Sequence, residues 1–348
     1  MPALNYFSRG VVLERHSEPA FSRTLRSFVM DEHIKTFASP HAGKTDLLDE
    51  ELIFIAQQAQ IIDETDGRPL YEKLKRLSLT SASALVVDAI DDQPYVSSGI
   101  NPLLQKSKEV VEALKIMADT FHVKSKYIAV YKQAYDTYTK IPSKLHGVEV
   151  RQIGGKYPTQ IIWEKHFSHH PEILAVGACA LIHLWRAIFE SRIQTSVFIT
   201  VNGNCVATPS NIEVPIGTRL DAIFAYCGLS DDPNLIVIGG PMSGKFVADP
   251  STANLGPASK AVLAIRDAER GREYKCAGCS RCSDVCPEGL VPFYIYRSIV
   301  CEKYDRVPFY RADKCITCGT CTYICPAKLP LAETIRKYLS SAQEEAQQ

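Results

Sequence analysis

The sequence lacks an excess of charge of either sign. Its 348 residues include 39 lysines and arginines and 39 aspartates and glutamates, and no block of like charge stands out. Proteins that bind nucleic acid usually carry a basic patch or stripe, because contacts to the phosphate backbone dominate their affinity. The composition therefore predicts no nucleic-acid partner.

Long apolar runs are also missing. The segment Met1 to Arg26 is polar and broken by charges, without the apolar core of a secretory signal. The longest apolar stretch, Ile173 to Trp185, is interrupted by His183 and falls short of the ~20 residues that span a bilayer. We therefore expect a cytoplasmic protein with no direct membrane insertion.

Glycine-rich loops are scarce as well. A phosphate-bearing cofactor needs several backbone N–H groups at close approach, which glycine loops or helix N-termini provide. The only glycine pairs are Gly154-Gly155 and Gly239-Gly240, and each is more simply interpreted as a turn. The residues therefore predict no nucleotide cofactor.

Cysteine, by contrast, is concentrated in one part of the chain. Of twelve cysteines, eight form two runs of identical spacing, each ending in Cys-Pro. The runs are Cys276-x-x-Cys279-x-x-Cys282-x-x-x-Cys286-Pro287 and Cys315-x-x-Cys318-x-x-Cys321-x-x-x-Cys325-Pro326. Where no export signal is present, such crowding favours metal ligation over disulfides.

This spacing is typical of two 4Fe-4S clusters. Three closely spaced cysteines surround one cluster, and the fourth, next to proline, ligates the other cluster. The sequence thus predicts cluster 1 on Cys276, Cys279, Cys282 and Cys325, and cluster 2 on Cys315, Cys318, Cys321 and Cys286. It predicts no catalytic residue, so the chemistry expected is electron transfer.

A pair of structural zinc sites is the alternative, because Cys-x-x-Cys pairs suit tetrahedral zinc. Zinc explains neither the extra middle cysteine nor the repeated Cys-Pro ending. The other four cysteines are interpreted as packed thiols rather than ligands. They are Cys179, Cys205, Cys227 and Cys301.

Upstream, the pattern from about Ala84 predicts a layered α/β domain. Strands are expected at 84–88, 127–131, 148–153 and 160–163. A helix is expected from Asn101, as N-cap before Pro102, to about Phe121.

A different unit begins near Thr195. The strand 197–201, an Asn202-Gly203 turn and the strand 204–207 predict a tight hairpin. A helix ending at Cys227, with Gly228 as C-cap, and a strand at 235–238 complete a small β-grasp pattern. The chain closes with a helix from Leu331.

The order of these parts, from about Ala84 onward, resembles the RnfC family, the peripheral subunit of the Rnf ferredoxin:NAD oxidoreductase, and the related cobalamin-reductase-like proteins of bacterial microcompartments. The matching pieces are Leu85 to Tyr95, Val148 to Pro158, Thr208 to Thr218, Gly239 to Gly244 and both cysteine motifs. The cysteine motifs occur in many ferredoxins, so the combination is what is specific.

The resemblance implies a multidomain α+β and α/β protein with four parts. Residues 1–80 would be a reduced N-terminal β-rich domain, a remnant of a β-sandwich. Residues 81–194 would form an α/β core similar to the flavin subunit of Complex I, 195–248 an SLBB-type β-grasp domain, and 249–348 a helical, ferredoxin-like two-cluster domain.

The chain also departs from the family. It has no Gly-Gly-x-Gly-Phe-Pro-Thr loop to cradle FMN and NADH. Asp91-Asp92-Gln93-Pro94 stands where relatives have Glu-Cys-Glu-Pro, and Ala175-Val-Gly177 where they have Asn-Val-Gly or Asn-Val-Glu. FMN is therefore not expected.

The resulting hypothesis is a subunit that relays single electrons between a donor and a partner redox protein, such as a ferredoxin or flavoprotein, in a hetero-oligomeric complex. That complex could be peripheral to a membrane or lie in a microcompartment. One alternative is a flavin- or NADH-dependent reductase with a divergent nucleotide site around Asp91, Asp92 and Tyr95. A second is a protein whose clusters are structural or sensory.

Overall fold

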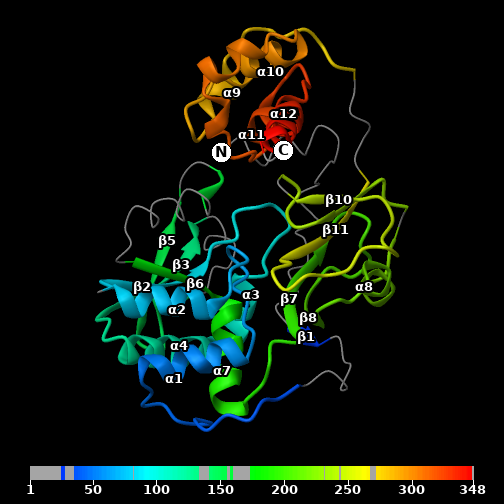
Figure 1. Ribbon diagram of the computed structural model, residues 1–348. Coiled ribbons are helices and arrows are strands. Elements are labelled where there is room, and N and C mark those ends of the chain that lie inside the picture. The colour runs from blue at the N-terminus through cyan, green and yellow to red at the C-terminus, as the bar shows by residue number, and fades with distance from the viewer. Residues whose placement is uncertain are drawn as a thin grey trace.

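A computed structural model describes residues 25–27, 35–80, 82–132, 141–154, 157–159, 173–230, 232–242, 244–266 and 272–346. The described chain forms an α/β unit, a second β-sheet unit beside it and a small helical unit at one end of the molecule (Figure 1). Among these residues, no helix has the length and hydropathy needed to cross a bilayer.

The α/β unit is built on a five-stranded sheet in the order β4-β5-β3-β2-β6. The strands are β2 (Ala84–Ala89), β3 (Ser125–Tyr131), β4 (Lys144–Leu145), β5 (Val148–Ile153) and β6 (Ile173–Gly177). All pairs are parallel except β4 with β5. The strands predicted at 84–88, 127–131 and 148–153 are confirmed, and the one at 160–163 lies outside the described residues.

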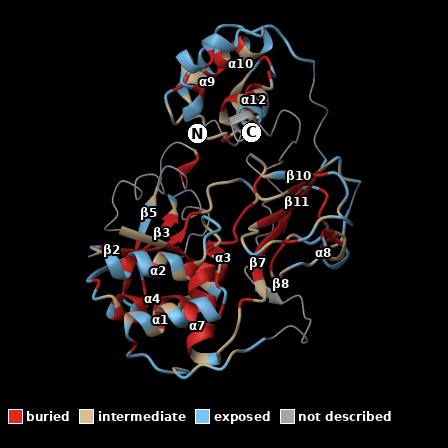
Figure 2. Cartoon of the chain, viewed as in Figure 1, coloured by how far each residue is buried: buried red, intermediate tan, exposed pale blue. Residues whose placement is uncertain are grey.

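Helices cover one face of this sheet. They are α1 (Asp49–Gln58), α2 (Leu70–Leu79), α3 (Ile100–Gln105), α4 (Ser107–Thr120) and α7 (Ala178–Glu190). Leu85, Val87 and Ile128 of the sheet share one buried cluster with Leu114 of α4 and Leu181 of α7. Figure 2 shows this core as the largest buried region, which supplies most of the hydrophobic stabilisation.

The segment before β2 differs from the prediction. Leu52, Ile55 and Ala56 of α1, and Leu70 and Leu74 of α2, follow helical spacing and are completely buried in the α/β core. The expectation of a β-rich domain is therefore wrong for the described residues 35–80.

The helix predicted from Asn101 to Phe121 is two helices. The backbone leaves helical geometry at Lys106, between α3 and α4. Asn101 is buried inside α3 and is not its N-cap. Instead, the carboxylate of Asp91 accepts hydrogen bonds from Gly99 N (2.9 Å) and Ile100 N (2.8 Å), so a residue of the preceding loop satisfies these amides.

The second unit is a six-stranded sheet in the order β1-β8-β7-β11-β9-β10. Its elements are β1 (Leu25–Ser27), β7 (Ser196–Asn202), β8 (Ser210–Pro215), α8 (Leu220–Cys227), β9 (Leu235–Ile238), β10 (Lys245–Val247) and β11 (Ala261–Ile265). The predicted helix end is confirmed, since Gly228 follows α8 with φ +74°. The helix packs on a core formed by the sheet.

The predicted tight hairpin is wrong in one respect. β7 pairs antiparallel with β8, after a loop at 203–209, and not with 204–207. Gly203 has φ +124°, and a Cβ there would collide with the carbonyl of Ala264 on β11. The glycine thus permits a close approach between backbones rather than a two-residue turn.

The helical unit carries both cysteine runs. Its elements are α9 (Arg281–Asp284), α10 (Pro292–Val300), the 3-10 turns at 304–306, 308–310 and 312–314, α11 (Thr320–Ile324) and α12 (Leu331–Ala346). The predicted start of the last helix is confirmed. Two small clusters of buried residues form its interior, and both include cysteines.

Candidate metal centre

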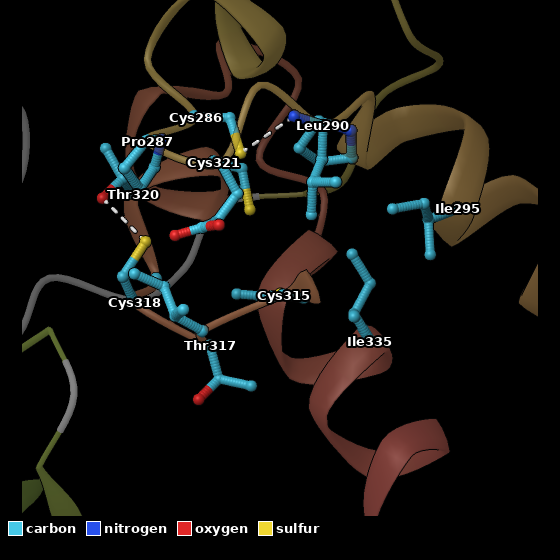
Figure 3. A pocket seen from close by; sticks show the side chains of 15 residues that line it. Cys286, Pro287, Leu290, Ile295, Cys315, Thr317, Cys318, Thr320, Cys321 and Ile335 are labelled. Carbon is cyan, nitrogen blue, oxygen red and sulfur yellow. Dashed lines mark hydrogen bonds between the residues drawn. The ribbon is translucent and has the colours of Figure 1, made fainter. Parts of the chain in front are cut away.

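Four of the predicted ligands surround one cavity in the helical unit. We name them the inner quartet: Cys286, Cys315, Cys318 and Cys321. Leu290, Ile295 and Ile335 close the cavity on its apolar side (Figure 3). Cys318 and Cys321 are buried, so this site is largely shielded from water.

The other four surround a second cavity, of about 120 Å³. We name them the outer quartet: Cys276, Cys279, Cys282 and Cys325. Phe293 and Tyr294 of α10 line the same cavity. Each quartet therefore combines three cysteines of one run with the last cysteine of the other.

Local backbone geometry explains how short loops hold these cysteines. Gly278 and Gly319, inside the two runs, have φ +66° and +82°, and Ser280 also has a positive φ of 57°. Left-handed residues reverse the chain quickly, so that cysteines three positions apart face a common centre. Glycine carries the least strain in this conformation.

Polar hydrogens point at the sulfur atoms. Gly278 N lies 3.4 Å from Cys276 Sγ, and Leu290 N lies 3.4 Å from Cys286 Sγ. Thr320 Oγ1 lies 3.3 Å from Cys318 Sγ. Such contacts favour charge on sulfur, and they tune the reduction potential of iron–sulfur centres.

Burial opposes thiolate formation where no metal is bound. It raises the pKa of the Cys321 thiol far above its ordinary value and raises the pKa of Cys282 and Cys315 as well. Neighbouring cysteines add to the rise at Cys321. Metal binding must therefore displace protons, which couples occupancy of these sites to pH.

In the part of the chain that the structure describes, no three His, Cys, Asp or Glu side chains converge on a point as ligands of a single ion would. The cysteines line cavities instead. Four thiolates around a volume suit a 4Fe-4S cubane, so the donor set fits the predicted cofactor.

The four remaining cysteines fall into two groups. Cys179, Cys205 and Cys227 are buried, as expected of packed thiols. Cys301 is exposed just after α10, so its interpretation as a packed thiol is wrong. The last turn of α10 leaves the side chain at the surface, and Cys301 lines neither quartet cavity.

A carboxylate that sequence reasoning missed caps α7. Glu64 Oε1 accepts a hydrogen bond from Cys179 N (2.8 Å), and Oε2 accepts one from Ala180 N (3.0 Å). Gly177 N lies 3.2 Å from both carboxylate oxygens of Asp63, and a Cβ on Gly177 would collide with Glu64. The chain's own acids thus occupy the first amides of α7.

The surrounding charges explain how two acids are tolerated there. Lys73 Nζ lies 2.7 Å from Asp63 Oδ2 and 2.9 Å from Asp66 Oδ2. Burial alone would raise the pKa of Asp63, but the charge and hydrogen bond of Lys73 outweigh it and lower this pKa. Burial, and then the charge of Asp63, raise the pKa of Glu64 to about 7.

A cavity of about 570 Å³ lies between the α/β unit and the second sheet. Asp91, Asp92 and Gln93 line it from the loop after β2, and Gly240 lines it from the loop after β9. A Cβ on Gly240 would collide with Gln93, so that side chain fills the close approach between the units. Tyr95, grouped with Asp91 and Asp92 in the nucleotide-site hypothesis, instead packs beside a separate apolar cluster.

Comparisons with known proteins give two domain matches. The 4Fe-4S dicluster domain model matches residues 275–329, and the SLBB domain model matches residues 198–246. The fold and the cysteine centre thus define an iron–sulfur protein with an SLBB domain and a ferredoxin-like C-terminal unit.

Curated relatives are named as the RnfC-type component of an ion-translocating oxidoreductase complex. The protein from Rhodobacter capsulatus is 26% identical over 248 residues, which is 65% of this chain and 47% of that relative. The protein from Cronobacter sakazakii is 24% identical over 241 residues, covering 64% of this chain and 31% of that relative. The predicted resemblance to the RnfC family is confirmed, although the chain spans less than half the length of these relatives.

Among solved structures, a chain of an NAD⁺-reducing [NiFe]-hydrogenase in its H₂-reduced state is similar, with a TM-score of 0.58 at 10% identity. The match covers 85% of this chain and 62% of that one. Identity this low shows a shared fold. With the domain match and the relatives, it supports an iron–sulfur electron-transfer subunit.

Proposed function

We propose that this chain relays single electrons, through two 4Fe-4S clusters, between a donor and a partner redox protein in a larger complex. The single observation that carries the proposal is the sorting of eight cysteines into two quartets around two neighbouring cavities. The dicluster domain match at residues 275–329 supports it.

The proposed ligands are those predicted from the spacing: the outer quartet for cluster 1 and the inner quartet for cluster 2. Bound clusters would supply one-electron acceptor and donor levels, and the protein would hold them in place. The apolar side chains around the inner quartet exclude water, and the N–H groups beside sulfur stabilise negative charge. Exchange of ligands between the runs would also tie the two halves of the unit together.

We also propose that the chain binds no FMN. Ligands of open α/β sheets usually bind at the carboxyl ends of the strands, with phosphate on a helix N-terminus. Here Glu64 and Asp63 occupy the N-terminal amides of α7, next to the end of β6. A phosphate would meet two buried carboxylates there, so the residues present do not fit the group.

The flavin proposal predicts that acid extracts of anaerobically purified protein contain no stoichiometric flavin. The protein should also retain none after incubation with FMN and gel filtration. Glu64→Ala frees two amides and is expected to increase FMN retention relative to the wild type. Glu50→Ala, at an exposed position, is the matched control. Stoichiometric FMN in the wild type would contradict the proposal.

A flavin- or NADH-dependent reductase with a divergent nucleotide site is the second candidate. The observation in its favour is the large cavity between the two units, lined by Asp91 and Asp92. Saturable NADH binding that is lost in Asp92→Ala, together with bleaching of cluster absorbance by NADH, would favour the reductase over the relay.

The relay itself predicts a definite cofactor content. About eight irons and eight sulfides per chain are expected, as two cubanes require. Dithionite should give an EPR signal of interacting clusters, because the two sites share one small unit. Zinc in place of iron would overturn the assignment. Iron that dithionite and ferredoxin cannot reduce would favour structural or sensory clusters.

A further inference from the structure

The two quartets differ in what lies next to them. Gly319, inside the second run, approaches the second sheet unit so closely that a Cβ would lie 2.7 Å from the carbonyl oxygen of Met242. Met242 follows β9, and its N–H is directed at Gln93 Oε1, 3.4 Å away, at the edge of the large cavity. The inner quartet therefore faces the body of the protein.

The outer quartet faces away from that body. Cys276 and Cys279 are exposed, as are all the residues from 272 to 281 that carry them. In Figure 2 the helical unit shows far more exposed surface than the two sheet units. A redox partner that approaches from solvent thus comes closest to the outer quartet.

Basic side chains surround the outer quartet. Lys275 precedes Cys276, and Arg281 precedes Cys282. Lys328 joins them because Tyr274 N donates to Ala327 O (3.0 Å), which brings the segment after Cys325 beside the first run. We name Arg272, Lys275, Arg281 and Lys328 the outer basic face; all four are exposed.

Acidic residues on the same face are fewer. They are Glu273 and Asp284, against the four basic residues, although the whole chain carries equal numbers of basic and acidic residues. The positive charge here is therefore local. It would attract a negatively charged partner and accelerate its association at low salt.

Two tyrosines add contact area beside these charges. Tyr274 is 62% exposed and Tyr294 is 52% exposed. Tyr294 lines the outer cavity itself, and Tyr274 lies two residues before Cys276. Exposed aromatic side chains beside charged groups are typical of protein-binding surfaces.

We propose that the outer basic face is the docking site of a small acidic one-electron carrier protein, which exchanges electrons with cluster 1. This inference rests on the proposed function. One electron leaves the reduced carrier, which is oxidised by one unit, and cluster 1 is reduced by one unit. No bond is formed or broken. Cluster 2, beside the protein body, is then the side for onward transfer.

The test compares two charge-reversed variants of the cluster-loaded chain. The first carries Lys275→Glu, Arg281→Glu and Lys328→Glu. The matched control carries Lys303→Glu, Arg306→Glu and Arg311→Glu, three exposed positions beyond the end of α10 that line neither quartet cavity. The probe is a two-cluster ferredoxin of strongly negative net charge, studied by calorimetric titration and by stopped-flow reduction at several NaCl concentrations.

The outer variant is expected to weaken ferredoxin binding at least about tenfold at low salt and to flatten its salt dependence, as loss of electrostatic steering requires. The control should change binding less than about twofold. Equal binding by wild type and outer variant, equal weakening by the control, or no binding by wild type would overturn the docking site. Iron content and dithionite reduction, measured on the same samples, show separately whether the relay assignment stands.

Discussion

Replacing Cys325 with alanine is expected to remove the cluster of the first cysteine run, although Cys325 belongs to the second. It lines the outer cavity with Cys276, Cys279 and Cys282. A cubane that loses one of four cysteine ligands is expected to be lost or degraded, so iron should fall from about eight to about four per chain. Iron and sulfide analysis of anaerobically purified protein measures this directly.

Double variants show which cluster was lost without a spectroscopic assignment. If Cys276 and Cys325 serve the same cluster, Cys276→Ala with Cys325→Ala should still retain about four irons. If Cys315 serves the other cluster, Cys315→Ala with Cys325→Ala should retain almost none. Cys301→Ala, at the exposed cysteine outside both cavities, is the control and should keep the full content. The reverse pattern in the two double variants would show that each run ligates its own cluster.

Loss of the Glu213 charge is expected to have the largest effect on stability. Arg186 of α7 pairs with both carboxylate oxygens of Glu213 on β8, so the pair joins the α/β unit to the second sheet. Both side chains are nearly buried, at 11% and 14% exposure. Glu213→Gln leaves the Arg186 charge without compensation, which costs about 3–5 kcal/mol in the free energy of unfolding.

Urea unfolding at pH 7, followed by fluorescence, measures this loss, because Trp185 is adjacent to Arg186 on α7. Glu149→Gln is the matched control. Its partner Arg151 forms an ion pair with both side chains about half exposed, worth roughly 1 kcal/mol or less. A Glu213→Gln midpoint that moved no further than that of the control would contradict the structural role of the buried pair.

The effect should also depend on pH. Burial alone would raise the pKa of Glu213, but hydrogen bonding and the charge of Arg186 outweigh it and lower this pKa to about 2, from an ordinary value of 4.5. A carboxylate with a lowered pKa stabilises the fold fully above its unfolded value and loses this contribution as pH falls through its folded value. The difference between wild type and Glu213→Gln should therefore be complete above about pH 4.5 and shrink towards pH 2.

Local patterns in the sequence were reliable where a short segment contains its own cause. The strand at 84–88 is nearly all apolar, and it forms the central, fully buried strand β2. Gly228 follows a helix whose end needs a left-handed residue. The Asn101-Pro102 signal was misleading, because Asp91 satisfies the amides at the start of α3 from a preceding loop.

Long-range contacts explain what the sequence did not reveal. Glu64 caps a helix that begins 115 residues later, and no local motif marks it as a cap. Gly203 was interpreted as a turn residue, yet its need for glycine comes from a strand about sixty residues further along. In both cases the partner is set by the packing of two sheets, which neighbouring residues do not encode.

The sequence by itself determined the ligands and chemistry proposed for this protein, because cysteine spacing acts within loops of a few residues and the eight positions are explicit. Tertiary structure alone decided that one quartet faces the protein body and the other faces solvent, and that Glu64 and Asp63 occupy the amides of α7. These features depend on which surfaces pack together, and burying apolar area fixes that choice across the whole chain.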